Sequence, residues 1–137
     1  MFKLVKITGA RINVPELAVV DIDGTSPYFF GCCYYFTQGT VLSYPTNEDD
    51  LKFIALEEIP QNSGKKTLLG YFVTENMVFE TEIYNDHTKV KVGDSLLLYS
   101  NTLGHSIGAD AEVGYDMKLL NKDEAATTGK VLVALKW

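Results

Sequence analysis

The sequence VVDIDGT at residues 19–25, followed by SPYFFGCCYYF at residues 26–36, decides the fold class. The first run is apolar and ends in the dipeptide Asp23-Gly24, which favours a turn because glycine adopts positive φ without steric cost. The second run is rich in aromatic and other strongly β-forming side chains. We therefore interpret residues 19–36 as two extended segments that fold back on each other at the turn.

Alternation of apolar and polar residues extends this interpretation to much of the chain. A period of two gives a strand one dry face and one wet face, which is typical of a half-buried strand. The clearest alternating segments are residues 77–83, 89–92, 112–119 and 130–137. Eight Tyr and seven Phe residues add side chains that suit a pleated surface.

Short turn signals separate these runs. They are Asp23-Gly24, Gln38-Gly39, Asn62-Ser63-Gly64, Asn85-Asp86, Gly93-Asp94, Leu103-Gly104 and Thr128-Gly129. Strands at this spacing predict an all-β fold, a small antiparallel barrel or sandwich, in a single domain over residues 1–137. A helix is conceivable only over residues 47–56, with Asn47 as N-cap. Residues 52–56 fit a strand equally well, so we expect at most one short helix.

The charge and hydropathy of the chain exclude several kinds of partner. The net charge is −6 and the 12 Lys and Arg residues are scattered, so no basic stripe could follow a nucleic-acid backbone. No apolar run approaches the roughly 18 residues of a membrane-spanning helix. The N-terminal residues alternate too strictly for a signal peptide. We expect no nucleic-acid or membrane partner, and assembly in the cytoplasm.

The residue types that usually carry catalysis are poorly arranged. Cys32 and Cys33 are neighbours, so a disulfide between them would be strained, and two buried thiols are the better interpretation. His87 and His105 lie far from both cysteines, which leaves no zinc-site spacing. Serine residues lack the context of a nucleophile elbow. We expect no catalytic, metal or cofactor site, and no enzymatic activity.

Residues 19–25 nevertheless resemble the first motif of the haloacid-dehalogenase phosphatases. That resemblance implies Asp21 as nucleophile and Asp23 as general acid/base, with a magnesium ion beside them. The motif should open onto a helix, whereas residues 26–36 are β-forming. The family's acidic motif would fall on residues 96–98, which are leucines and cannot bind magnesium. A magnesium-dependent phosphatase using Asp21 and Asp23 stays a less favoured alternative.

Four segments resemble, in the same order, those of small proteins encoded among the head genes of tailed bacteriophages and prophages. They are KITGARINVPE (6–16), YFVTENMVFET (71–81), KVGDSL (91–96) and TTGKVLVAL (127–135). The resemblance spans most of the chain, and its motifs are structural rather than catalytic. The aromatic segment from Tyr28 to Tyr44 departs from that pattern.

The resemblance implies a head decoration, or cement, protein. Such proteins are small, rich in β-structure and often trimeric, and they sit on the outside of the capsid at junctions between capsomers. The implied partners are the major capsid protein and further copies of the chain, with a trimer favoured. The implied role is to stabilise the head of the virion against the pressure of packaged DNA. A structural component of the tail or baseplate is the alternative.

The N-terminal segment is the expected partner contact. Phe2, Leu4, Val5 and Ile7 belong to a strand pattern at a chain end, the kind of arm that can join the sheet edge of a neighbour. An edge strand of the chain's own barrel explains the same pattern equally well.

Overall fold

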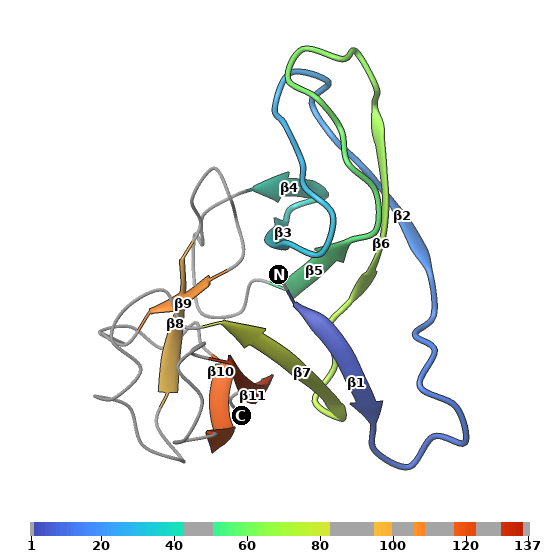
Figure 1. Ribbon diagram of the computed structural model, residues 1–137. Coiled ribbons are helices and arrows are strands. Elements are labelled where there is room, and N and C mark those ends of the chain that lie inside the picture. Colours follow the sequence, from blue (N-terminus) through green and yellow to red (C-terminus); the bar gives the residue numbers. More distant parts are fainter. Residues whose placement is uncertain are drawn as a thin grey trace.

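The computed structural model describes residues 2–42, 51–82, 95–99, 106–108, 117–122 and 130–135 (Figure 1). These residues form strands and connecting segments without a helix, and every pairing between the strands is antiparallel. The strands are β1 (Lys3–Ile7), β2 (Ala18–Asp21), β3 (Cys33–Thr37), β4 (Thr40–Leu42), β5 (Leu51–Ala55), β6 (Thr67–Phe72), β7 (Met77–Glu82), β8 (Ser95–Tyr99), β9 (Ser106–Gly108), β10 (Met117–Lys122) and β11 (Lys130–Leu135). The all-β prediction is confirmed.

Several of the segments predicted from the sequence lie partly or wholly outside the described residues. The possible helix over residues 47–56 overlaps β5, so its second half is a strand, while residues 47–50 lie outside the described residues. The predicted strand at 89–92 and the turns at 85–86, 93–94, 103–104 and 128–129 also lie outside them, as do His87 and His105. The strands predicted over 77–83 and 130–137 are present as β7 and β11 up to Glu82 and Leu135, and residues 83, 136 and 137 lie outside the described residues.

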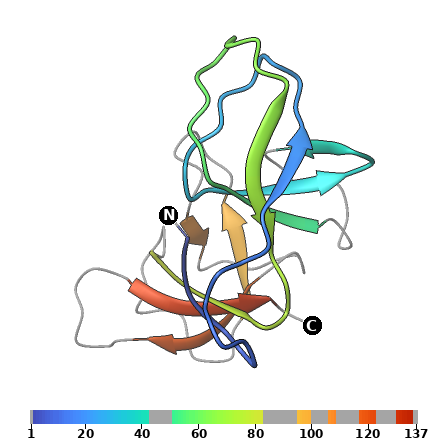
Figure 2. The ribbon, with the colours of Figure 1, turned by 90° about the vertical axis from the view of Figure 1, so that its right-hand side faces the viewer.

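Five strands form a strongly curved sheet in the order β2-β6-β5-β3-β4. Its two edge strands, β2 and β4, approach each other, so the sheet is a nearly closed barrel (Figure 2). β3 and β4 are joined by the two residues Gln38 and Gly39, with φ of 49° and 78°. Two positive φ values match the right-handed twist of a tight hairpin, which confirms the turn predicted there.

The remaining six strands form a second sheet in the order β1-β7-β11-β10-β8-β9. β1 is one edge of this sheet and, among the described strands, pairs with β7 alone. The register of that pair shifts between Leu4 and Lys6, so Val5 is the extra residue of a bulge. A bulge twists an edge strand and interrupts its pairing pattern.

The buried apolar side chains of the described residues gather in two hydrophobic clusters. The cluster inside the barrel consists of Val20, Ile22, Tyr28, Cys32, Tyr34, Val41, Phe53, Ala55, Ile59 and Leu68. The cluster between the two sheets consists of Phe2, Ile7, Cys33, Tyr35, Ile54, Tyr71, Val73, Met77, Phe79 and Val133. Consecutive residues of β3 and β5 therefore enter opposite clusters, as side chains of a strand must. Burial on both faces explains why the segment that begins at Tyr28 is so rich in aromatic side chains.

The prediction that residues 19–36 fold back on themselves was wrong in its pairing. β2 and β3 are both extended, but β6 and β5 lie between them in the sheet. β2 pairs instead with β6, which is far away in sequence. The physical reason is that both edges of β3 are already paired, with β4 through the tight hairpin at Gln38 and Gly39 and with β5 on the other side.

The connection from β2 to β3 forms half of a protruding structure at the top of Figure 1, the double loop, defined as residues 22–32 and 56–66. The two halves are joined by backbone hydrogen bonds, from Asn62 N to Thr25 O at 2.9 Å and from Gly64 N to Gly24 O at 3.0 Å. An isolated bridge between Tyr28 and Ile59 links them nearer the barrel. The double loop is therefore an extension of the sheet rather than two independent loops.

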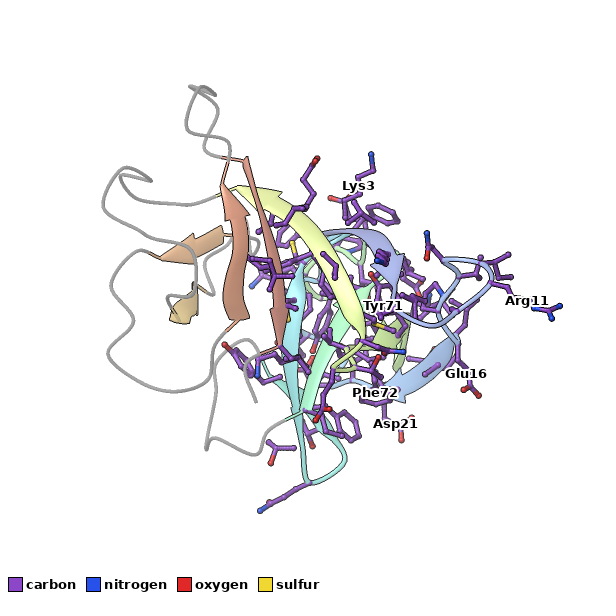
Figure 3. All side chains as sticks on the ribbon, turned by 90° about the horizontal axis from the view of Figure 1, so that it is seen from below. Lys3, Arg11, Glu16, Asp21, Tyr71 and Phe72 are labelled. Atoms are coloured by element: carbon purple, nitrogen blue, oxygen red, sulfur yellow. The ribbon has the colours of Figure 1, made fainter. Side chains whose placement is uncertain are left out.

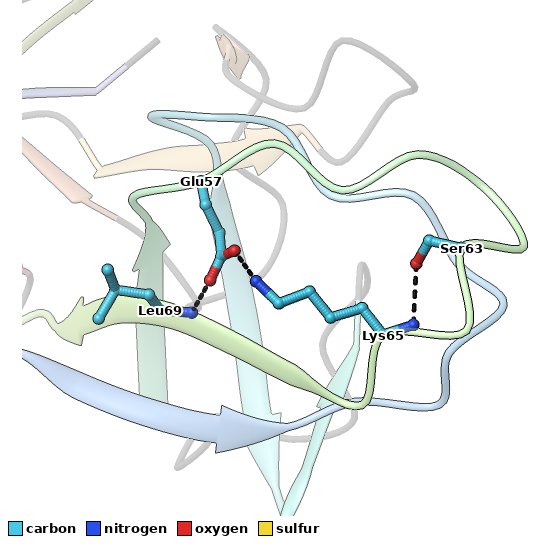
Figure 4. Close-up of polar contacts among 4 residues, drawn as sticks. All are labelled: Glu57, Ser63, Lys65 and Leu69. Carbon is cyan, nitrogen blue, oxygen red and sulfur yellow. Dashed lines mark hydrogen bonds and ion pairs between the residues drawn. The ribbon is translucent and has the colours of Figure 1, made fainter.

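The carboxylate of Glu57 anchors one half of the double loop (Figure 4). It accepts a hydrogen bond from the backbone N–H of Leu69 at 2.6 Å and pairs with the ammonium group of Lys65. The N–H of Lys65 in turn donates to Ser63 Oγ at 3.1 Å. The Lys65 ammonium and the Leu69 N–H both stabilise the ionised form, which lowers the pKa of Glu57.

Candidate functional site

An apolar groove of about 420 Å³ lies where β1 meets the barrel. Five separate parts of the chain form it: β1, the segment joining β1 to β2, the residues before β3, the end of β5, and β6. The lining residues are Phe2, Lys3, Leu4, Asn13, Pro15, Leu17, Phe30, Gly31, Ile54, Leu56 and Tyr71. Apart from Lys3, Asn13 and the phenol of Tyr71, their side chains are apolar. This size and lining are typical of a preformed binding site.

Backbone hydrogen bonds hold the groove open in one shape. Phe2 N donates to Gly31 O at 2.8 Å, and Gly31 N donates to Ala55 O at 2.8 Å, so the start of β1 is tied to the barrel. Phe2 also packs edge to face against Phe79, with ring centroids 6.0 Å apart. Gly31 has a φ of 76°, which a residue with a side chain rarely adopts. These contacts hold Phe2 and Gly31, two of the groove-lining residues, in place against the barrel and β7.

Large apolar side chains are exposed at the mouth of the groove and beyond it. Phe30 is 49% exposed and Leu17 is 57% exposed. The exposure continues along the connecting segment, where Ile12 and Val14 are 69% and 65% exposed, and into β2, where Val19 is 64% exposed. We call residues 12–19 the apolar segment. Contiguous exposed apolar side chains on a folded protein mark a surface that contacts another molecule.

Sequence reasoning placed the contact in the neighbouring strand and missed the apolar segment. The signal was present in residues 12–19, which read INVPELAV. Pro15 lacks a backbone N–H and so interrupts any strand ladder there, while apolar residues continue on both sides of it. An apolar run that begins before a strand, around a proline that interrupts pairing, is a candidate for surface contact.

The four N-terminal residues predicted as a partner contact have different environments. Phe2 and Ile7 are buried in the cluster between the sheets, and Leu4 is half-buried and lines the groove. Val5 lies at the bulge of β1. Contact of these residues with a partner stays a prediction, and the groove is the place where Phe2 and Leu4 would be reached.

The outer edge of β1 is occupied by a side chain of the chain itself. Asn13 Oδ1 accepts a hydrogen bond from Ile7 N at 2.9 Å, and Asn13 Nδ2 donates to Val5 O at 3.3 Å. These are the edge groups that an added strand from a neighbour would use. β1 is thus an edge strand of its own sheet, and its edge is covered by the segment that follows it.

Asp21 and Asp23, the residues of the phosphatase alternative, lie at the end of β2 and in the turn that follows it. Asp21 is exposed at the end of β2. Asp23 Oδ1 accepts hydrogen bonds from Thr25 N at 2.8 Å and Ser26 N at 2.9 Å, and Asp23 Oδ2 accepts one from Ser26 Oγ at 2.8 Å. Three donors occupy most of the roughly four acceptor sites of this carboxylate, which suits the stabilisation of a turn and leaves little capacity to bind a metal ion. The geometry favours a structural role for Asp23.

The same hydrogen bonds lead to a prediction about acid stability. The donors at Ser26 and Thr25 lower the pKa of Asp23 from 3.8 to about 2. Asp23→Ala is expected to cost about 1 kcal/mol of unfolding free energy at neutral pH, as for loss of a capping side chain. Because the pKa is lowered in the folded state, this stabilisation is present above the ordinary pKa and is lost as the pH falls towards 2.

Urea unfolding of Asp23→Ala and of the unsubstituted protein between pH 7 and pH 2 measures this difference. Asp21→Ala, at an exposed position two residues earlier, is the matched control and is expected to change stability little. A cost for Asp23→Ala that stays constant down to pH 2 would contradict the proposed role of the ionised carboxylate.

The cysteines are free thiols, as predicted, and both are buried. Cys32 lies in the cluster inside the barrel and Cys33 in the cluster between the sheets. Burial raises the pKa of Cys33 to about 12, so it stays protonated and acts as a small apolar side chain. Among the described residues, no three His, Cys, Asp or Glu side chains gather as a metal site. Within the same residues, no helix has the length and apolar character needed to cross a membrane.

Comparison with models of protein families gives no match, and neither do comparisons with curated proteins and with solved structures. The resemblance to head decoration proteins therefore rests on the four quoted segments and stays a prediction. The groove and the apolar segment are the structural features on which a functional proposal depends.

Proposed function

We propose that this protein is a noncatalytic structural module of a virion, a decoration protein that binds the major capsid protein on the outer surface of the head. The observation that carries the binding role is the preformed apolar groove with Phe30 and Leu17 exposed at its mouth. The capsid as partner follows from the resemblance of the four sequence segments. In this proposal a protruding apolar side chain of a capsid subunit enters the groove.

The mechanism is additive over many copies. A protein contact of standard size buries about 800 Å² on each partner. One such contact across two capsomers resists their separation modestly, but neighbouring contacts act together on the same shell and oppose the outward pressure of DNA. The net charge of −6 suits this role, because an acidic surface disfavours binding to DNA and self-aggregation.

Substitution at the groove mouth tests the proposal. Phe30→Asp is expected to weaken binding to capsids by at least tenfold, because a charge would replace an aromatic ring at the contact and would lose its water on binding. Leu51 on β5 is 54% exposed and does not line the groove, so Leu51→Asp is the matched control. Circular dichroism and thermal unfolding establish that both variants fold.

The measurement is co-sedimentation of the purified protein with capsids that lack it, from the phage or prophage that encodes it, followed by electron microscopy. Density at capsomer junctions in hundreds of copies supports decoration of the head. Density confined to the tail or baseplate, in few copies, would support the alternative structural role instead. Unchanged binding of folded Phe30→Asp would rule out the groove as the contact. Magnesium-dependent phosphate-ester turnover that disappears in Asp21→Asn would overturn the noncatalytic assignment.

A further inference from the structure

We propose that the apolar segment, residues 12–19, is a contact between two copies of this chain, which lie antiparallel about a two-fold axis between Pro15 and Glu16. This contact shares Leu17 with the mouth of the groove, but Ile12, Val14 and Val19 do not line the groove, and the test of the contact does not involve capsids. The partner is a second copy of the chain for two reasons. When two copies of the segment run in opposite directions, apolar side chains lie beside apolar side chains, and positive charges lie near negative ones.

The apolar residues match when the segment is set against itself in the opposite direction. About an axis between residues 15 and 16, Ile12 lies beside Val19 of the other copy, and Val14 lies beside Leu17. All four side chains are more than half exposed in the single chain. Because the contact has two-fold symmetry, each pair occurs twice, and the contact covers every large apolar side chain of the segment.

The charges that border the segment select the same direction. Arg11 precedes the apolar segment, and Asp21 follows it by two residues. Figure 3 shows Arg11, Glu16 and Asp21 along one outer side of the molecule, pointing away from its body. In this antiparallel register each Arg11 lies opposite Val20 of the other copy, one residue away from Asp21 of that copy, so the two opposite charges are neighbours. A parallel arrangement would set like charges against each other, which disfavours it.

Side chains rather than backbone ladders would form this contact. Pro15 at the axis has no N–H to donate, and Asn13 uses its amide group on the edge of β1. Glu16 lies next to the axis, so the two Glu16 carboxylates of a dimer approach each other and repel. This single unfavourable pair gives the proposed register a distinctive test.

Analytical ultracentrifugation of the purified chain over a concentration series up to about 100 μM measures the association. The unsubstituted chain is expected to form a dimer. The double variant Ile12→Asp/Val19→Asp is expected to be monomeric over the same range, because four charges would enter the contact. Leu51→Asp, with comparable exposure elsewhere on the surface, is expected to dimerise normally.

Charge substitutions test the direction and the register. Arg11→Asp alone and Asp21→Arg alone are each expected to weaken the dimer by roughly tenfold or more, since each turns two attractive pairs into repulsive ones. Combined in one chain they restore the pairs with reversed sign, and the affinity is expected to return to within about threefold of the original. Glu16→Gln is expected to tighten the dimer by about twofold to fivefold.

A monomeric chain would overturn the proposal, as would a trimer. A dimer that survives Ile12→Asp/Val19→Asp would place the contact elsewhere. A double charge variant that is no tighter than the single ones, or Glu16→Gln that weakens association, would overturn the antiparallel register. These measurements use no capsids. A negative result would therefore refute the dimer without refuting the capsid contact, which Phe30→Asp tests.

Discussion

The substitution Gly70→Ala is expected to lower the free energy of unfolding by about 3 kcal/mol or more, a large part of the stability of an ordinary domain. A Cβ atom on Gly70 would lie 2.1 Å from the carbonyl oxygen of Ile54, and 2.5 and 2.7 Å from ring atoms of Phe53. The Ile54 oxygen belongs to the backbone of β5, so it cannot rotate away as a side chain would. Relief requires β5 and β6 to move apart in the middle of the sheet.

The position of Gly70 explains why the space is absent. Leu68 and Phe72, two residues away on either side, belong to or pack against the cluster inside the barrel, so the missing side chain of Gly70 would point there too. The ring of Phe53 occupies that space and packs edge to face against Phe72, with centroids 5.1 Å apart. Glycine inside a strand often marks such a close approach of neighbouring groups.

Denaturant unfolding of Gly70→Ala, with Gly39→Ala and Gly64→Ala as controls, separates steric conflict from backbone strain. Both control glycines have positive φ and no atom within 4 Å of an added Cβ. Their substitution is expected to cost about 1–2 kcal/mol, the price of placing a side chain in the left-handed region. If Gly70→Ala costs no more than these controls, the close approach of β5 to β6 is wrong.

The sequence predicts the local elements of this fold well, because alternation and turn chemistry act over a few residues. The Gln38-Gly39 hairpin and the strand β11 were predicted from such patterns and are present. Asp23-Gly24 was also predicted as a turn, and Gly24 has a φ of 85°. Each of these depends on residues that are neighbours in the chain.

The pairing of β2 with β6 and the shape of the groove could not be predicted in the same way. Cys33, Tyr34 and Tyr35 are all buried, so β3 shows no alternation that would reveal which face meets which cluster. The groove combines five parts of the chain, and its walls exist only after the two sheets pack together. The phosphatase-like motif at residues 19–25 has the same weakness. It matches over a few neighbouring residues, but it does not reveal that β2 pairs antiparallel with the distant β6.

The substitution Phe79→Ala is expected to lower the free energy of unfolding by about 3–5 kcal/mol. Phe79 is fully buried on β7, where Leu4 and Val133 are its Cα partners on the two neighbouring strands. Its ring meets Phe2 edge to face and stacks on Tyr71 of the barrel, with centroids 6.4 Å apart and planes inclined by 6°. Removing it leaves a cavity at the point where the two sheets share their side chains.

Urea unfolding followed by intrinsic fluorescence and by far-ultraviolet circular dichroism measures the loss, with two control variants. Val78→Ala, at the half-buried neighbouring position of the same strand, is expected to cost less than Phe79→Ala. Phe79→Leu keeps most of the buried area and is expected to recover more than half of the lost stability.

The form of the transition tests the prediction that the chain is a single domain. Because the cluster around Phe79 contains residues of both sheets, removing its ring should destabilise the barrel and the six-stranded sheet together. Both optical probes of Phe79→Ala should then report one transition at a lower urea concentration. Two separated transitions, with the barrel retained in the second, would show instead that the cluster inside the barrel is sufficient for the barrel to fold alone. Native-state hydrogen exchange identifies the retained part, since amides of β5 and β6 would keep their protection while those of β7 lose it.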